Sequence, residues 1–150
     1  MSANGVRRSL LRLMVEGSRA LEGTLHEGLR EAGYGDVRPA HYAVFRYLEP
    51  EGSRVTELAE AAGMTKQSMG ELVGHLERCG YVERRTDPRD GRAKIVVPTE
   101  KGRRGIEAAA ERIAEIEAEL AGRMGNERLE ALAGSLAELT AILGEPEGGR

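Results

Sequence analysis

The pattern of apolar and polar residues is clearest between residues 65 and 79, where apolar side chains recur at spacings of three and four. This spacing predicts an amphipathic helix with one buried face. Thr65 can accept a hydrogen bond from an amide of the first turn, and Gly80 can take the left-handed conformation that ends a helix. The apolar residues of this face are Met69, Leu72, Val73 and Leu76.

A shorter helix is expected just before it, from Glu57 to Ala62, with Thr56 as its N-cap and Gly63 as its end. The turn between the two helices spans residues 62–65 and contains a glycine. Two short helices joined in this way predict a helix-turn-helix.

The periodicity changes from helical to alternating after the second helix. Residues 81–86 and 93–98 read as two strands, and the Pro- and Gly-containing segment 87–92 reads as the turn between them. A strand, a short basic turn and a second strand, placed directly after a helix-turn-helix, predict the wing of a winged helix.

Further amphipathic helices are expected on both sides of this segment. A loop is expected at residues 33–37, and Pro146 and the segment 147–150 are expected to follow the last helix as a stop and a frayed tail. Asn126 is expected to cap that last helix. The expected helices run from about Val6 to Glu31, from Pro39 to about Leu48, from Thr99 to about Gly122 and from Asn126 to Gly144.

The first and last helices carry more apolar surface than the small winged core can cover. Two copies of the chain could bury these faces against each other. An intramolecular bundle would use the same pattern, so the alternative stays open.

In combination and order, the motifs of this chain resemble the multiple-antibiotic-resistance regulator (MarR) family of bacterial transcription factors. The resemblance implies a mainly α fold with a small β-hairpin (α+β), a winged helix-turn-helix with N- and C-terminal dimerisation helices. It implies one MarR-type domain over residues 1–150, divided into 1–37, 38–104 and 105–150. The matching segments are residues 58–59, 76–77, 80–84, 87–92 and 98–102.

Two positions depart from the family pattern. The wing tip often has Asp-Arg-Arg in the family, whereas this chain has Asp90-Gly91-Arg92, which removes one phosphate contact. Pro98 stands where a Leu is common, and proline is tolerated at a strand end.

Charge is distributed unevenly along the chain, whose net charge is −3. Residues 54–104 contain 11 Lys/Arg and 8 Asp/Glu, and residues 105–150 contain 4 and 10. A locally basic surface on an acidic support still attracts phosphate. No apolar run reaches the roughly 20 residues of a membrane span, and a single cysteine cannot form an internal disulfide. We therefore expect a cytoplasmic protein without a metal or cofactor, and no catalytic motif indicates an enzyme.

A helix that reads the major groove must present donors and acceptors to base edges. Gln67 can bond adenine in a bidentate manner, and Thr65, Lys66 and Ser68 can contact phosphate or base. Gly70 costs roughly 1 kcal/mol relative to Ala in a helix interior, which close approach to a groove would explain; a tolerated surface glycine is the alternative. The remaining residues assigned to DNA on this helix are Glu71, His75 and Arg78.

In the wing, Arg89 and Arg92 flank a tip that could enter a minor groove, where negative potential attracts guanidinium groups. By resemblance, Arg92 corresponds to the minor-groove arginine and Asp90 to the acid that orients the wing. The alternative for these residues is a surface ion pair of little energetic value.

The resemblance also implies a small aromatic or phenolic effector, bound between the dimerisation helices and the winged domain. Packing in the core or an interface is the commoner role for each candidate residue. Cys79, at the end of the second helix, is expected to be a half-buried structural residue rather than a redox switch. The effector candidates are His26, Tyr34, His41, Tyr42 and Phe45.

The predicted function is a homodimeric, sequence-specific transcription regulator, most often a repressor in this family, bound to a pseudo-palindromic double-stranded operator. The alternative is a winged-helix adaptor that uses the same face for protein contacts and does not bind DNA.

Overall fold

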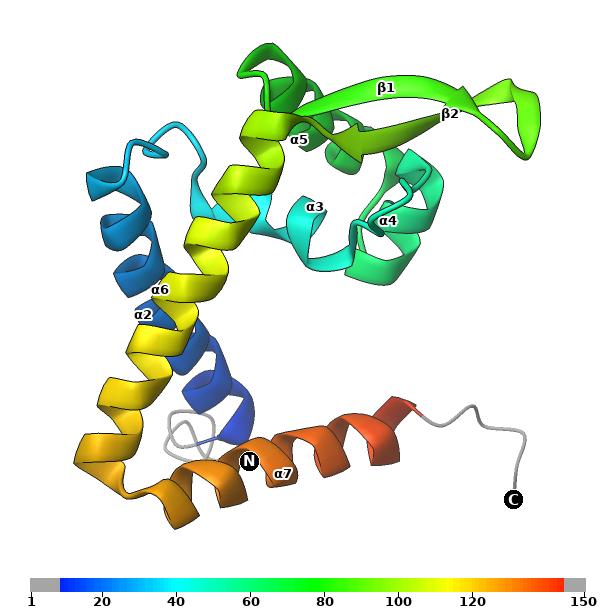
Figure 1. The fold of residues 1–150 in the computed structure, drawn as a ribbon. Helices are drawn as coiled ribbons and strands as arrows, with labels where there is room; N and C mark the ends of the chain where they lie inside the picture. The colour runs from blue at the N-terminus through cyan, green and yellow to red at the C-terminus, as the bar shows by residue number, and fades with distance from the viewer. Residues whose placement is uncertain (1–8, 145–150) are drawn as a thin grey trace. The chain divides into compact units, whose positions relative to one another are not determined.

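The computed structural model describes residues 9–144, which form helices and one two-stranded antiparallel hairpin (Figure 1). The start expected at Val6 and the features expected at residues 146–150 lie outside the described residues. The described residues divide between Arg112 and Ile113 into two compact units. The elements in chain order are α2 (Leu10–Glu31), η1 (Pro39–His41, a 3-10 helix), α3 (Tyr42–Tyr47), α4 (Val55–Ala62), α5 (Lys66–Arg78), β1 (Val82–Asp87), β2 (Asp90–Pro98), α6 (Glu100–Met124) and α7 (Asn126–Gly144).

The helix-turn-helix consists of α4 and α5, as predicted. Gly63 ends α4 with φ 65°, a left-handed conformation that costs glycine little because it has no Cβ. Thr65 caps α5, and its hydroxyl oxygen accepts from the Ser68 amide at 3.1 Å. The turn expected from the sequence is therefore confirmed.

The prediction that Thr56 is the N-cap of α4 is wrong. The cap is Arg54, so α4 begins at Val55 and Thr56 lies inside the first turn. The carboxylate of Glu57 reaches back to accept from the Arg54 amide at 3.0 Å, which satisfies a donor that has no partner within the helix.

The hairpin is longer and its turn tighter than predicted. The strands pair from Val82 with Pro98 to Asp87 with Asp90, which leaves Pro88 and Arg89 as the turn. Within the segment that the sequence assigned to the turn, only Asp87 and Asp90 pair, and the register of the ladder shifts between Thr86 and Asp87. A bridge between Ser53 and Val96 joins the linker ahead of α4 to β2, a contact without a sequence signal.

The last helix also begins differently from the prediction, because Asn126 is its first residue and not its cap. Gly125 precedes it with φ 96°, and its carbonyl accepts from Leu129 N at 3.1 Å. The positive φ lets the chain change direction between α6 and α7, a bend that favours glycine.

The core of the first unit lies under α5. Met69, Val73 and Leu76 are fully buried, as the helical spacing predicted, and Leu72 is half-buried. Burying a side chain of this size contributes about 1.5–3 kcal/mol. The rest of the buried cluster is Leu29, Val37, Tyr42, Val44, Leu58, Ala59, Tyr81, Val82 and Val96.

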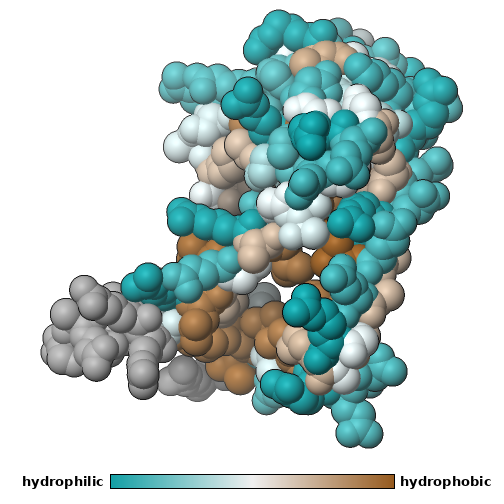
Figure 2. Space-filling view, turned by 90° about the vertical axis from the view of Figure 1, so that its left-hand side faces the viewer, coloured by the Kyte–Doolittle hydropathy of each residue, from teal (hydrophilic) through white to brown (hydrophobic). Residues whose placement is uncertain are grey.

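The terminal helices leave large apolar side chains at the surface, some of which appear brown in Figure 2. Isolated apolar residues at a surface need no explanation, but a run on one helix does. In α2 these residues are Leu10, Leu11, Leu13, Met14, Val15 and Leu21. In α6 and α7 they are Ile106, Ile113, Leu132, Ile142 and Leu143.

Candidate nucleic-acid interface

The first turn of α5 presents polar side chains around free backbone amides. The Thr65 hydroxyl donates to Ser68 Oγ at 2.9 Å, so these two residues hold each other in place. Lys66 and Gln67 are exposed, and their side chains make no hydrogen bond or ion pair with the described part of the chain. A helix N-terminus of this kind favours an anion such as a phosphate. These four predicted residues therefore form one exposed group.

The middle of α5 is open on the same side. A Cβ built on Gly70 would meet no atom within 4 Å, and one on Gly74 would meet only the Arg78 guanidinium, at 3.3 Å. Glu71 and Arg78 are exposed. Another surface can thus approach the helix closely at Gly70 without displacing any side chain of the unit.

His75 is not part of this exposed group. Its ring stacks on His41 with centroids 4.1 Å apart, and its Nε2 lies 2.9 Å from the carbonyl oxygen of Asp36. At about 100° per residue, His75 lies only about 60° from Leu72 around the helix, so it belongs to the border of the buried stripe. The hydrogen bond and the stack hold it toward the unit's interior.

The wing presents its arginines from the turn and from the start of β2, and Figure 1 shows the hairpin extending beyond α4. The Arg92 side chain is 95% exposed, and its Nε lies 3.6 Å from Asp90 Oδ1. Asp90 also accepts from the Arg92 amide at 3.1 Å. Arg89 is 67% exposed, with an ion pair of 3.7 Å to Glu57 of α4. The structure therefore leaves both wing guanidinium groups accessible.

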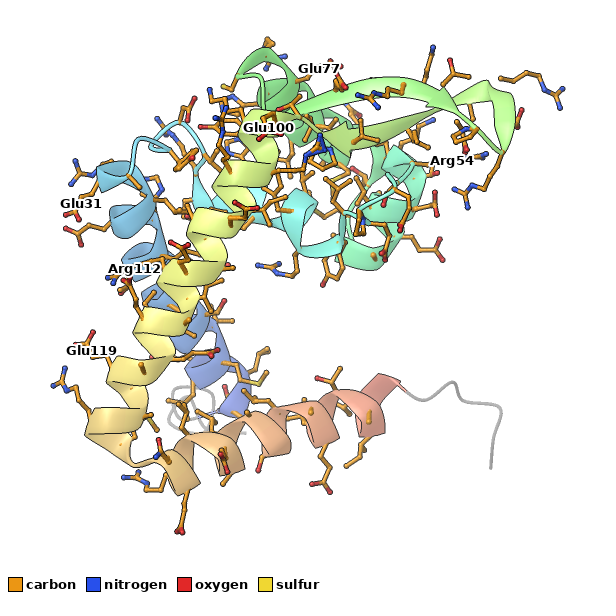
Figure 3. All side chains as sticks on the ribbon, viewed as in Figure 1. Glu31, Arg54, Glu77, Glu100, Arg112 and Glu119 are labelled. Atoms are coloured by element: carbon orange, nitrogen blue, oxygen red, sulfur yellow. The ribbon has the colours of Figure 1, made fainter. Side chains whose placement is uncertain are left out.

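Asp87 connects the wing to the helix-turn-helix, a role that was not predicted from the sequence. Its carboxylate is fully buried and accepts from the Arg89 amide at 2.8 Å and from Arg54 Nε at 2.8 Å. The bond from the Arg89 amide and the bond from Arg54 lower the pKa of Asp87 below its usual range. Figure 3 labels Arg54, which comes directly before α4.

A signal for this connection was present in the sequence. An Asp followed by Pro at the end of a strand can accept from an amide two residues on and so build the turn. The buried partner Arg54 had no such signal, because it is 33 residues away along the chain.

The effector candidates do not share one environment. His26 and His41 bond the loop between α2 and η1, whereas Tyr34 packs its ring against Tyr81 with centroids 6.2 Å apart. Phe45 is half-buried against the core. Tyr42 is buried, and its hydroxyl has no hydrogen-bond partner within residues 9–144. Burial, with the nearby charge of Glu22, raises the pKa of Tyr42 to about 12.

Cys79 is half-buried at the C-terminal end of α5. Its Sγ lies 3.6 Å from His75 Nε2. Within residues 9–144, no helix is long and apolar enough to cross a membrane, and no cluster of His, Cys, Asp and Glu is suited to a metal ion.

Comparisons with known proteins agree with this arrangement. A sequence model described as the MarR family matches residues 36–93, which hold both helices of the helix-turn-helix and most of the wing. The transcriptional regulator HosA of Escherichia coli O111:H- is 32% identical over 96 residues, which cover 63% of this chain and 71% of HosA.

Solved structures extend the likeness over nearly the whole chain. The transcriptional regulator PA4135 has a TM-score of 0.73 at 27% identity, covering 92% of this chain and 98% of PA4135. The repressor CouR bound to a 23-mer DNA duplex has a TM-score of 0.74 at 22% identity, covering 93% and 98%. CouR from Rhodococcus jostii RHA1 bound to p-coumaroyl-CoA has a TM-score of 0.70 at 24% identity, covering 91% and 92%.

The fold class predicted from the sequence, mainly α with a small hairpin, is confirmed by these structures. The match to the family model and the identity to HosA also confirm the resemblance drawn from the motifs. This chain belongs to the MarR family of transcriptional regulators.

Proposed function

We propose that the chain is a homodimeric, ligand-responsive repressor that binds a pseudo-palindromic double-stranded DNA operator in the cytoplasm. One observation carries the DNA-binding part. The exposed group at the start of α5 and the exposed Arg92 of the wing belong to one compact unit, and the buried Asp87–Arg54 pair ties the wing to the helix-turn-helix.

In this proposal α5 enters a major groove. Gln67 reads base edges, while Thr65, Lys66 and Ser68 contact bases or phosphates near the helix N-terminus. Gly70 permits close approach, and Glu71 accepts from a cytosine amine or pairs with a cation. Arg78 contacts the backbone further along the helix.

The wing supplies the second contact. Arg92 enters the flanking minor groove, and Arg89 supports it from the turn. Asp90 holds the Arg92 amide and Asp87 fixes the base of the turn, so the guanidinium groups are positioned before DNA is met.

Dimerisation is supported by the exposed apolar side chains of α2, α6 and α7. The proposed division is residues 1–37 and 105–150 for dimerisation and 38–104 for DNA binding. Two recognition helices would then contact half-sites about one helical turn apart, which explains how a chain of net negative charge binds DNA with useful affinity.

In this proposal an effector releases the chain from DNA. CouR binds p-coumaroyl-CoA, and we infer a small aromatic or phenolic effector here as well. The buried, unpartnered hydroxyl of Tyr42 supports it, because a buried polar group without a partner costs free energy that a ligand can recover. A ligand that binds one spacing of the two recognition helices better than another shifts the dimer away from the DNA-bound spacing. The family assignment supports binding rather than catalysis as the mode of action, so we infer no enzymatic activity.

The test is selection of duplexes from a random-sequence pool by the purified full chain, in parallel with Arg92→Ala. We expect enrichment of one inverted repeat and weaker enrichment by the variant. The affinity for that repeat should fall steeply with salt, because bound Lys and Arg release counterions from phosphates. No enrichment at low salt would instead favour the protein adaptor and refute the repressor.

A further inference from the structure

The three histidines of the chain bond three consecutive residues of one loop. His75 of α5 lies with its Nε2 2.9 Å from the Asp36 carbonyl oxygen, and His26 of α2 lies with its Nδ1 3.1 Å from the Val37 carbonyl oxygen. The Arg38 amide donates to Nδ1 of His41 in η1 at 2.9 Å. The loop joins α2 to the winged helix, so three imidazoles hold the connection to the recognition helix.

The partner atoms determine the proton positions on these rings. A carbonyl oxygen only accepts, so His26 and His75 donate to it. A backbone N–H only donates, so Nδ1 of His41 accepts, and neutral His41 carries its proton on Nε2. An imidazolium donates from both nitrogens. Protonation therefore preserves the bonds of His26 and His75 and breaks the bond between Arg38 and His41.

The stack makes a charge on His41 less favourable still. The rings of His41 and His75 are 6° from parallel, with centroids 4.1 Å apart, and His41 is 8% exposed. Two imidazolium rings at this separation repel each other with little water between them. Burial, followed by the proximity of His75, holds the pKa of His41 below its ordinary value of 6.5.

The other charged groups around the pair do not cancel this effect. The positive charge of the Arg38 side chain disfavours a charge on His41, and the Asp36 carboxylate favours it. The Asp36 carboxylate, however, already accepts a short hydrogen bond of 2.5 Å from the Tyr81 hydroxyl. On α5 the further neighbour is Cys79, 3.6 Å from His75 Nε2, and Lys101 of α6 contributes a positive charge near Asp36.

We propose that His41 is a proton-sensitive latch that regulates DNA binding. In its neutral form His41 accepts from the Arg38 amide and stacks on His75, so it connects the loop at residues 36–38 to the recognition helix. In its charged form it can no longer accept from the Arg38 amide, and the loss of this bond frees the C-terminal half of α5 and weakens operator binding. The DNA readout of this inference rests on the proposed function.

The direction with pH follows from the lowered pKa of His41. We call the state in which neutral His41 accepts from the Arg38 amide and stacks on His75 the closed form. Because the pKa of His41 is depressed in this form, its stability is complete above the ordinary pKa of 6.5. The stability is lost as pH falls through the lowered pKa of the closed form. Acidification ordinarily strengthens binding to DNA, since histidines gain positive charge. A fall in affinity below pH 6.5 therefore runs against this general trend and is the change expected of the latch.

The experiment measures affinity for the selected duplex across this pH range. We expect the wild type to lose about tenfold in affinity for the duplex for each pH unit by which the closed form lowers the pKa of His41. His41→Asn should remove the loss, because the Asn carbonyl accepts from the Arg38 amide and does not titrate. His75→Gln keeps a donor for Asp36 and should reduce the loss, and it serves as the second variant if His41→Asn does not fold. His26→Asn changes the histidine of α2 that contacts the same loop at Val37, and this matched control should keep the wild-type loss.

A measurement without DNA separates this inference from the proposed function. Nitrogen-15 NMR of the free protein should show neutral His41 protonated on Nε2, with a midpoint below 6.5 and a shift of the Arg38 amide at the same midpoint. A midpoint above that value, or a pH-dependent loss retained in His41→Asn, would overturn the latch. If the chain bound no DNA at any pH, the proposed function would fail, and the NMR titration would still decide whether the latch exists.

Discussion

Asp87 and Arg54 lie 33 residues apart in the chain, and their side chains meet in a hydrogen bond of 2.8 Å between Arg54 Nε and Asp87 Oδ2. Arg54 is the N-cap of α4, and Asp87 is the last residue of β1. The contact therefore joins the start of the helix-turn-helix to the base of the wing turn. Asp90, the acid that the family resemblance assigned to wing orientation, accepts from the Arg92 amide at the start of β2.

Asp87→Asn should weaken operator binding more than Asp90→Asn. The first substitution removes a buried charge that holds both Arg54 and the Arg89 amide, whereas the second changes an exposed carboxylate with a local partner. Titration of each variant against the selected duplex, with far-UV circular dichroism to establish folding, measures the difference. Equal affinities for the two variants would refute the orienting role of Asp87.

The buried carboxylate of Asp87 should also make the folded protein less stable in acid. The bonds from the Arg89 amide and Arg54 depress the pKa of folded Asp87, so its contribution is present above the ordinary value of 3.8 and is lost as pH falls through the folded value. Thermal unfolding of the wild type should show this loss between about pH 5 and pH 2. Asp87→Asn should start from a lower midpoint and show a shallower acid slope. Identical slopes would indicate that Asp87 is not charged in the folded protein.

Lys66→Ala should reduce the salt dependence of DNA binding. Removing one phosphate contact lowers the slope of log affinity against log salt by about 0.9, because one fewer counterion is released on binding. Arg19→Ala removes the same charge from the exposed part of α2 and is the matched control. Fluorescence anisotropy at several salt concentrations measures both slopes, and a slope unchanged by Lys66→Ala would remove Lys66 from the interface.

Gly70→Ala should stabilise the free protein and weaken its binding to DNA. A Cβ at Gly70 meets nothing within 4 Å, so the expected gain is the difference in helix propensity, about 1 kcal/mol. The same methyl group would occupy space that a closely approaching groove needs. A Cβ at Gly122 in α6 also meets nothing within 4 Å. Gly122→Ala should therefore stabilise the protein without weakening its binding to DNA. Denaturant unfolding and DNA titration give the two quantities, and undiminished DNA affinity would support a merely tolerated glycine.

Leu11→Glu should convert the dimer to monomers. Leu11 is 74% exposed on α2, where a charge costs little in an isolated chain but is unfavourable in an apolar dimer interface. Sedimentation equilibrium should show the change, and operator affinity should fall because only one half-site remains bound. Gly23→Glu places the same charge on the polar side of α2, where an added Cβ meets nothing within 4 Å, and tests whether charge alone disrupts the dimer.

Local sequence determined the helices of the winged segment. The spacing of Met69, Val73 and Leu76 placed the buried face of α5, because the helical period turns sequence spacing into direction. Thr65 and Gly63 marked helix ends through properties of their own side chains and backbone. The motifs were sufficient for the family, since each one reports on a local turn or cap.

Tertiary structure decided the contacts between distant segments. The helical period places His75 at the border of the buried stripe, where either side is open to it, and its stack on His41, which lies in a different helix, holds it inward. Arg54 and Asp87 likewise gave no local sign of their pairing. Such contacts depend on how packed elements bring segments together, and a periodicity confined to one element carries no information about its partner.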